Sequence, residues 1–211
     1  MINPLGTEQL SLGTTLGTMV YYSPNQPPWP QIKPDLRPTL VFLHGFGGGS
    51  SAYEWSKVYP AFASDYRVIA PDLIGWGRSE HPERNYTDID YIDSIIEFIE
   101  KIASEPVIVI ASSLTAAFTI RAAIQRPELF KALILTTPAG LSDFAEDYRR
   151  SIFAQIISVP FLDQFFYSAG LATSNGILNF LQTRQFAQPK RVYPEIVDAY
   201  LKSAQQPNAQ Y

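Results

Sequence analysis

The chain contains no cysteine and only two histidines, His44 and His81, among its 211 residues. The absence of cysteine excludes disulfide bonds, thiolate metal sites and cysteine nucleophiles. It also fits a cytoplasmic location, which we take as the prediction from sequence. The scarcity of histidine restricts the choice of a general base, because imidazole is the side chain most often used for proton transfer near neutral pH.

The sequence also lacks long runs of basic or of apolar residues. No Lys/Arg-rich block occurs, and the formal net charge is -4, so nucleic acid is not an expected partner. No apolar segment approaches the roughly 20 residues that a membrane helix needs, so we predict no membrane span. The amino terminus also lacks the basic and apolar regions of a signal peptide. With 46% apolar and 17% charged residues, the composition is that of a globular domain.

The sequence does contain four apolar, β-branched runs of strand length, at residues 39–44, 66–73, 106–111 and 131–137. They lack alternation, which is typical of strands buried on both faces of a parallel sheet. Helical patterns lie between them at residues 90–103, with Asp90 as a possible N-cap, and at residues 114–125. This alternation predicts an α/β fold with a mostly parallel sheet flanked by helices. Residues 9–22 predict an additional N-terminal hairpin or a pair of short strands.

The pattern changes after Gly140. Residues 143–206 contain no run typical of a strand, but they show amphipathic helical patterns and many phenylalanines. We therefore predict two parts. Residues 1–140 would form the α/β core, and residues 141–211 would form an all-helical cap.

The segment VIVIASSLTAAFTIRAA, residues 107–123, predicts a strand, a polar turn and a helix. A nucleophilic serine on such a turn needs small residues two positions before and two after it, because strand and helix approach closely there. For Ser113 these residues are Ala111 and Thr115, whereas for Ser112 both would be bulky aliphatic side chains. Ser113 is therefore the candidate nucleophile, although a β-branched Thr115 fits less well than glycine. The alternative is an ordinary joint that contains serine.

Two loops with glycines follow predicted strands. HGFGGG at residues 44–49 would expose backbone N–H groups that can stabilise an oxyanion, or it would be an ordinary flexible loop. In APDLIGWGRSEHP at residues 70–82, Asp72 is expected to accept N–H bonds of its own loop rather than to act in catalysis. In the same loop, His81 is expected to be an exposed surface residue rather than a base.

The order of HGFGGG, PDLIGWGRSE, VIVIASSLTAAFTIRAA and ALILTTPAG resembles the α/β-hydrolase fold superfamily over about residues 39–140. The resemblance implies an α/β-hydrolase core with a helical cap, and it implies no metal or organic cofactor. It gives Ser113 the role of nucleophile and the backbone N–H groups of Phe46 and Leu114 the role of oxyanion hole. It gives structural roles in the loops to His44, Asp72, Gly75, Gly77 and Ser79.

The sequence departs from the family pattern at the serine turn and after the cap. Ala111 and Thr115 stand where the family usually has glycines. Members of the family have two more strands after the cap, and the following loops carry the acid and the histidine. Asp143 is a candidate acid, because a minority of lipases place the acid after the strand that corresponds to residues 131–137. We expect a C-terminal segment or a second chain to complete the sheet and to supply the base.

Two functions remain open at this point. The first is a carboxylic ester hydrolase that acts on an apolar small-molecule ester through an acyl-enzyme. A fainter similarity of the motifs to bacterial and plastid hydrolases near the pheophytinases implies bulky apolar esters. The second is a catalytically inactive homologue that acts as a binding or scaffold protein.

Overall fold

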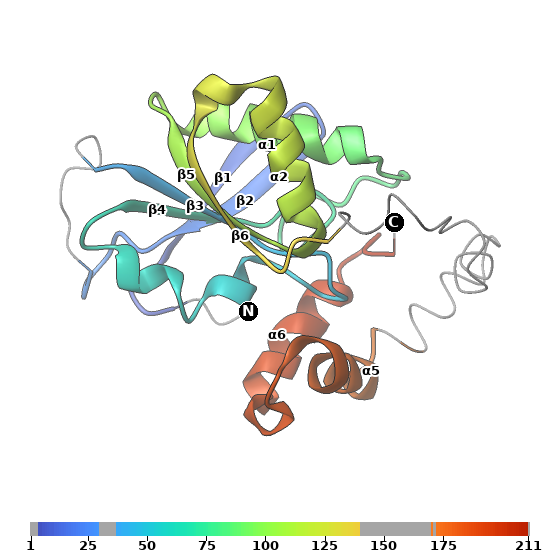
Figure 1. The fold of residues 1–211 in the computed structure, drawn as a ribbon. Helices are drawn as coiled ribbons and strands as arrows, with labels where there is room; N and C mark the ends of the chain where they lie inside the picture. The colour runs from blue at the N-terminus through green and yellow to red at the C-terminus, as the bar shows by residue number, and fades with distance from the viewer. Residues whose placement is uncertain (1–3, 30–36, 140–169, 171, 211) are drawn as a thin grey trace.

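The computed structural model describes residues 4–29, 37–139, 170 and 172–210. Within them lies a six-stranded sheet of order β1-β2-β4-β3-β5-β6 (Figure 1). The strands are β1 (Glu8–Thr14), β2 (Gly17–Ser23), β3 (Thr39–Leu43), β4 (Arg67–Pro71), β5 (Val107–Ser112) and β6 (Phe130–Thr136). Strands β3 to β6 pair in parallel, and β2 joins β4 antiparallel. The prediction of a mostly parallel α/β sheet with an N-terminal hairpin is confirmed.

The central strands are buried on both faces, as the unbroken apolar runs predicted. Successive side chains of a strand point to opposite faces, so each central strand contributes to two cores. Val41 and Leu43 of β3 pack with the helices α1 (Asp88–Ile102) and α2 (Ser113–Gln125). Leu40 and Phe42 pack on the other face, beneath the short helices Ala52–Trp55 and Tyr59–Phe62. The sheet is therefore covered from both sides.

Helix α1 begins two residues before the predicted start. Its N-cap is Thr87, whose hydroxyl accepts a hydrogen bond from the Asp90 N–H, while the Asp90 carboxylate accepts one from the Thr87 N–H. The prediction of Asp90 as N-cap was therefore wrong. Asp90 lies at the third helical position and completes a capping box, which satisfies two backbone donors at once.

Strand β6 differs from the prediction of burial on both faces. Three of its residues are exposed, and Ile134 retains 50% of its accessible surface. The reason is its place in the sheet, because β6 pairs with β5 on one side and is the last strand among the described residues. The composition of a segment indicates its propensity to form a β-strand, but it does not indicate whether another element packs against that strand.

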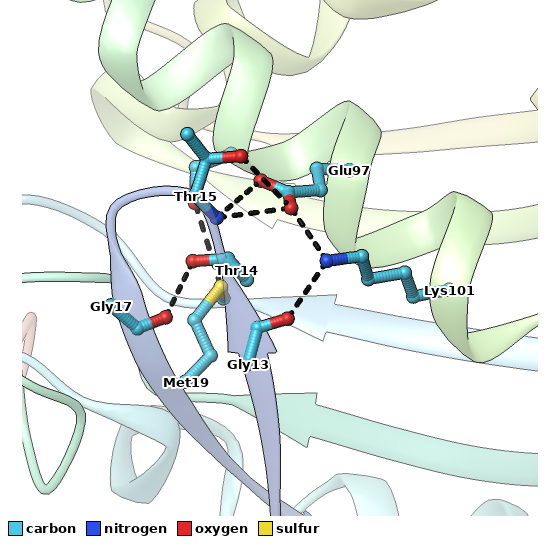
Figure 2. Close-up of polar contacts among 8 residues, drawn as sticks. Gly13, Thr14, Thr15, Gly17, Met19, Glu97 and Lys101 are labelled. Atoms are coloured by element: carbon cyan, nitrogen blue, oxygen red, sulfur yellow. Dashed lines mark hydrogen bonds and ion pairs between the residues drawn. The ribbon is translucent and has the colours of Figure 1, made fainter.

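Helix α1 also fixes the tip of the β1–β2 hairpin (Figure 2). The Glu97 carboxylate accepts hydrogen bonds from the Thr15 N–H at 2.9 and 3.0 Å and from the Lys101 ammonium at 2.6 Å. Lys101 also donates to the Gly13 carbonyl at 2.9 Å. The hairpin is thereby attached to the layer of helices as well as to β4.

The helices α5 (Ser174–Phe180) and α6 (Pro194–Ala204) form a separate pair, shown in orange and red in Figure 1. They confirm the helical prediction for the end of the chain, and no strand occurs between residues 172 and 210. Residues 140–169, and with them the predicted boundary after Gly140, lie outside the described residues. None of the described helices has both the length and the apolarity to cross a membrane.

Helix α6 docks on the loops that follow β3 and β4. The Ser203 hydroxyl donates to the Ser50 carbonyl and accepts from the Gly77 N–H, both at 3.1 Å. Gly49 has φ +78°, and a Cβ built there would lie 2.2 Å from the Tyr200 carbonyl oxygen. Glycine is thus required at this position both by its backbone conformation and by the close approach of α6.

Candidate active site

The turn between β5 and α2 carries Ser113 in an unusual backbone conformation. Strand β5 ends at Ser112, helix α2 begins at Ser113, and Ser113 has φ +55°. A positive φ is uncommon for a residue with a Cβ, and it costs roughly 1–2 kcal/mol when the residue is not glycine. Strain of this kind marks a sharp strand-to-helix turn that presents its side chain away from the sheet.

The residues two before and two after Ser113 fit this turn. Ala111 and Thr115 are fully buried. The Thr115 hydroxyl donates a hydrogen bond of 2.7 Å to the carbonyl of His44, at the start of the glycine loop. The β-branched residue that seemed less suitable than glycine therefore links the helix to that loop.

The glycine loop after β3 packs directly on the serine turn. A Cβ built on Gly45 would lie 3.1 Å from the Ser112 Oγ and 3.1 Å from the Ser113 Cβ. The next residue, Phe46, is anchored by its ring, whose centroid lies 4.6 Å from that of Tyr91 and 4.9 Å from that of Trp76. The loop and the turn that the sequence singled out are thus brought together.

The two predicted oxyanion donors belong to these two segments. Phe46 lies in the glycine loop, and Leu114 lies in the first turn of α2. Backbone N–H groups in the first turn of a helix have no acceptor within that helix, so they are available to a ligand. The same end of the helix favours negative charge nearby.

His44 is a structural residue of the loops. It is fully buried, its Nδ1–H donates to the Gly45 carbonyl at 2.8 Å, and its Nε2 accepts from the Leu73 N–H at 3.0 Å. Burial lowers the pKa of His44 to about 4, which keeps the ring neutral near pH 7. Both ring nitrogens are occupied, so His44 is not placed to take a proton from a substrate or from Ser113.

Asp72 holds the loop after β4, as expected from the sequence. Its carboxylate accepts from the N–H groups of Ala52 at 2.7 Å and Arg78 at 2.8 Å and from the Tyr22 hydroxyl at 3.1 Å. Burial raises the pKa of Asp72 to about 6, and these donors oppose that rise. The carboxylate thus joins three segments that are far apart in the chain.

His81 is not the exposed surface residue that was predicted. Its Nε2 is buried and has no hydrogen-bond partner among the described residues, and burial lowers its pKa. Its carbonyl accepts a hydrogen bond from the Asn208 side chain near the end of the chain. The contact with residues so distant in sequence explains why the polar, proline-flanked loop gave no sign of this burial.

Glu54 is a residue of the site that sequence reasoning missed. It comes from the short helix Ala52–Trp55, and its carboxylate lies between the glycine loop and Ser112. Burial raises the pKa of Glu54, and hydrogen bonds from Ser112, Gly45 and Ser50 lower it. Nothing in the sequence signalled this position, since Glu54 and Ser112 are 58 residues apart.

Three further observations concern the candidate acid, a hollow and metal binding. Asp143, the candidate acid, lies outside the described residues. A hollow of about 750 Å³ is lined by Arg67, Glu105, Lys131 and their neighbours. These residues lie at the amino ends of the strands, so the hollow is at the opposite end of the sheet from Ser113. Among the described residues, no cluster of three or more acidic or histidine side chains could hold a metal ion.

Comparison with known protein families identifies the family of the fold. A sequence profile described as alpha/beta hydrolase fold matches residues 38–188, which is more than half of the chain. The chain belongs to the alpha/beta hydrolase fold family. Ser113, the glycine loop and Asp72 all lie within the matched region.

The curated relatives of this α/β hydrolase include proteins named as esterases and hydrolases. It is 38% identical over 116 residues to the strigolactone esterase RMS3 of Pisum sativum, covering 52% of this chain and 42% of that protein. It is 32% identical over 105 residues to a 2-hydroxymuconate semialdehyde hydrolase of Pseudomonas, covering 49% of this chain and 37% of that protein. The matched stretch thus spans less than half the length of these relatives.

Solved structures share the fold at low identity. The epoxide hydrolase CorEH superposes with a TM-score of 0.76 at 20% identity, covering 97% of this chain and 70% of that chain. The protein Cfl2 from Burkholderia cenocepacia superposes with a TM-score of 0.73 at 21% identity, covering 93% of this chain and 65% of that chain. At this level of identity the likeness concerns the fold alone.

Proposed function

We propose that this α/β hydrolase is a serine hydrolase that cleaves carboxylic esters of apolar small molecules through an acyl-enzyme. The observation that carries the proposal is the positive φ of Ser113 at the joint of β5 and α2, against which the glycine loop packs. A strained serine at this position is what a nucleophile elbow requires, and strain that the surrounding structure maintains is a feature of functional sites. Relatives named as esterases support the choice of reaction.

In this mechanism the Ser113 Oγ attacks the ester carbonyl, and the serine proton passes to a general base. The N–H groups of Phe46 and Leu114 donate to the oxyanion of the tetrahedral intermediate. The intermediate collapses to an acyl-enzyme as the alcohol leaves with a proton from the same base. Water then attacks the acyl-enzyme by the reverse roles and releases the carboxylic acid.

The general base is proposed to be a histidine from a C-terminal segment or a second chain. His44 is excluded because both of its ring nitrogens are engaged in structural hydrogen bonds. The exposed strand β6 offers the edge on which further strands would pair. A cytoplasmic location stays a prediction from the sequence.

The preference for an apolar substrate rests on the aromatic character of the helical part. Phe180 of α5 reaches the glycine loop, since a Cβ built on Gly47 would lie 2.9 Å from the Phe180 ring. An aromatic side chain beside the proposed oxyanion donors favours an apolar acyl or alcohol group over a charged one.

Labelling with a fluorophosphonate probe tests the proposal, because such probes react covalently only with activated serines. We expect the full-length protein to be labelled and Ser113→Ala to lose labelling completely. Ser104→Ala, which alters an exposed serine, serves as the matched control and should be labelled like the wild type. If no labelling depends on Ser113, the proposal of a serine hydrolase is refuted. The alternative function, a catalytically inactive binding or scaffold protein, would then be favoured.

A further inference from the structure

The Glu54 carboxylate bridges the two segments that carry the proposed oxyanion donors. One oxygen accepts a hydrogen bond of 2.5 Å from the Ser112 hydroxyl, and the other accepts one of 3.0 Å from the Gly45 N–H. Ser112 directly precedes the proposed nucleophile, and Gly45 directly precedes Phe46. The Glu54 side chain, from a third segment, thus contacts the residue before the proposed nucleophile and the residue before the proposed oxyanion donor Phe46.

The same carboxylate also contacts the residue after Phe46 indirectly, through Ser50. The Ser50 hydroxyl lies 3.5 Å from Glu54 Oε2 and accepts a hydrogen bond of 3.0 Å from the Gly47 N–H. The two peptide groups that flank the Gly45–Phe46 peptide are therefore both held, one directly through the Gly45 N–H and one through Ser50 and the Gly47 N–H. Fixing both sides restricts the direction in which the Phe46 N–H points, which is what a preorganised oxyanion donor requires.

We propose that Glu54 is a positioning residue that holds the glycine loop against the serine turn and so aligns the Phe46 and Leu114 N–H groups. This role rests on the proposed function of Ser113 and deepens it. Its three hydrogen-bond partners among the described residues, Gly45, Ser50 and Ser112, all donate to it, so the arrangement matches the ionised carboxylate, which only accepts. Charge-assisted hydrogen bonds are stronger than neutral ones, and their loss should loosen the loop.

Four variants of the full-length protein isolate this role. Glu54→Gln keeps the shape but replaces one acceptor oxygen with a donor group. Ser112→Ala removes the hydroxyl partner, and Ser112→Thr restores it in a backbone conformation that β-branched residues adopt readily. Glu105→Gln changes an exposed glutamate and is the matched control.

The readout is the rate constant of fluorophosphonate labelling together with its end-point stoichiometry. We expect Glu54→Gln and Ser112→Ala each to slow labelling by about tenfold, the loss expected for one charge-assisted hydrogen bond, while the end-point stays at one label per chain. An unchanged end-point shows that every molecule is folded, so a loss of folded protein cannot explain the slower rate. Ser112→Thr and Glu105→Gln should react close to the wild-type rate.

The combination of both changes adds a second criterion. Since Ser112 is proposed to act through its hydrogen bond to Glu54, adding Ser112→Ala to Glu54→Gln should slow labelling little more than Glu54→Gln alone. Labelling of Glu54→Gln at the wild-type rate would overturn the role of Glu54 and leave Ser113 as the nucleophile. If the rate reductions of the two single variants multiply in the double variant, the two side chains act independently, and the proposed coupling between Glu54 and Ser112 is wrong.

Hydrogen exchange tests the same contact without any reaction. We expect the amides of residues 44–50 to exchange faster in Glu54→Gln and Ser112→Ala than in the wild type and in Glu105→Gln. If the wild type is not labelled at all but exchange rises as expected, the proposed function fails and Glu54 still holds the loop. Unchanged exchange in Glu54→Gln overturns the inference whatever the labelling shows.

Discussion

At the scale of single residues, Ser113 combines two demands that conflict. The backbone at φ +55° favours glycine, and the proposed chemistry requires a hydroxyl on a Cβ. The protein keeps the Cβ and therefore carries local strain that the packing of Ala111, Thr115 and Gly45 maintains. Stability is thus lost at the position where the proposed reaction needs the hydroxyl of its nucleophile.

This conflict predicts that Ser113→Gly raises the free energy of unfolding relative to Ser113→Ala by about 1 kcal/mol. Both variants lack the hydroxyl, but only glycine relieves the strain of a Cβ at positive φ. Chemical denaturation of the two variants measures the difference. A less stable glycine variant would mean that the turn is unstrained and that its conformation has no link to function.

The roles of residues could be predicted where they depend on near neighbours. The choice of Ser113 over Ser112 followed from side-chain size two positions away, and the structural role of Asp72 followed from its place in a short loop. Glu54 could not be found in this way. Its partners Gly45 and Ser112 lie 9 and 58 residues away, so their meeting depends on the tertiary fold.

At the scale of elements, the sheet was predicted well because buried parallel strands have a strong sequence pattern. The start of α1 and the exposure of β6 were the errors. The first arose because both members of the capping box, Thr87 and Asp90, are of residue types that cap helices, and the second because burial depends on what lies beside a strand. The sequence thus predicts the presence of a helix or strand better than it predicts where that element ends or what packs beside it.

The contact of the hairpin with α1 yields a prediction for Glu97 (Figure 2). Glu97→Ala should lower the free energy of unfolding by about 1 kcal/mol, because the Thr15 N–H and the Lys101 ammonium lose their acceptor. Amides of residues 13–17 should also exchange faster. Glu100→Ala, which alters an exposed ion pair with Arg126, is the control and should change stability less.

The pH dependence of this effect has a defined sign. Burial tends to raise the pKa of Glu97, but the hydrogen bonds from Lys101 and Thr15 outweigh it and lower the pKa below its ordinary value. The contribution is therefore complete above the ordinary pKa of glutamate and is lost as the pH falls through the lowered value. The difference between wild type and Glu97→Ala should shrink on acidification, and a constant difference would contradict the contact.

At the scale of the whole molecule, the sheet has two different edges. The edge at β1 belongs to a hairpin held by α1, whereas the edge at β6 carries exposed apolar residues, including Ile134. An exposed apolar edge is a template for pairing with another strand. This surface is where the proposed C-terminal segment or second chain would bind.

We predict that the 211-residue chain, purified by itself, self-associates through β6 and that Ile134→Lys shifts it toward the monomer. Analytical ultracentrifugation over a range of concentrations measures the change. Ile124→Lys is the matched control, because Ile124 is 74% exposed and belongs to helix α2 rather than to β6. A wild-type chain that is a stable, monodisperse monomer would count against the expected partner segment.

The strand order β1-β2-β4-β3 also has a consequence for synthesis on the ribosome. The hairpin is complete at Ser23, but the strand on which it docks begins only at Arg67. At roughly 5–20 residues per second, the finished hairpin waits a few seconds for β4 to emerge. During that interval Met19 and Tyr22, which are buried in the folded protein, face water. The nascent chain is therefore open to misassociation through this hairpin well before the serine turn has been made.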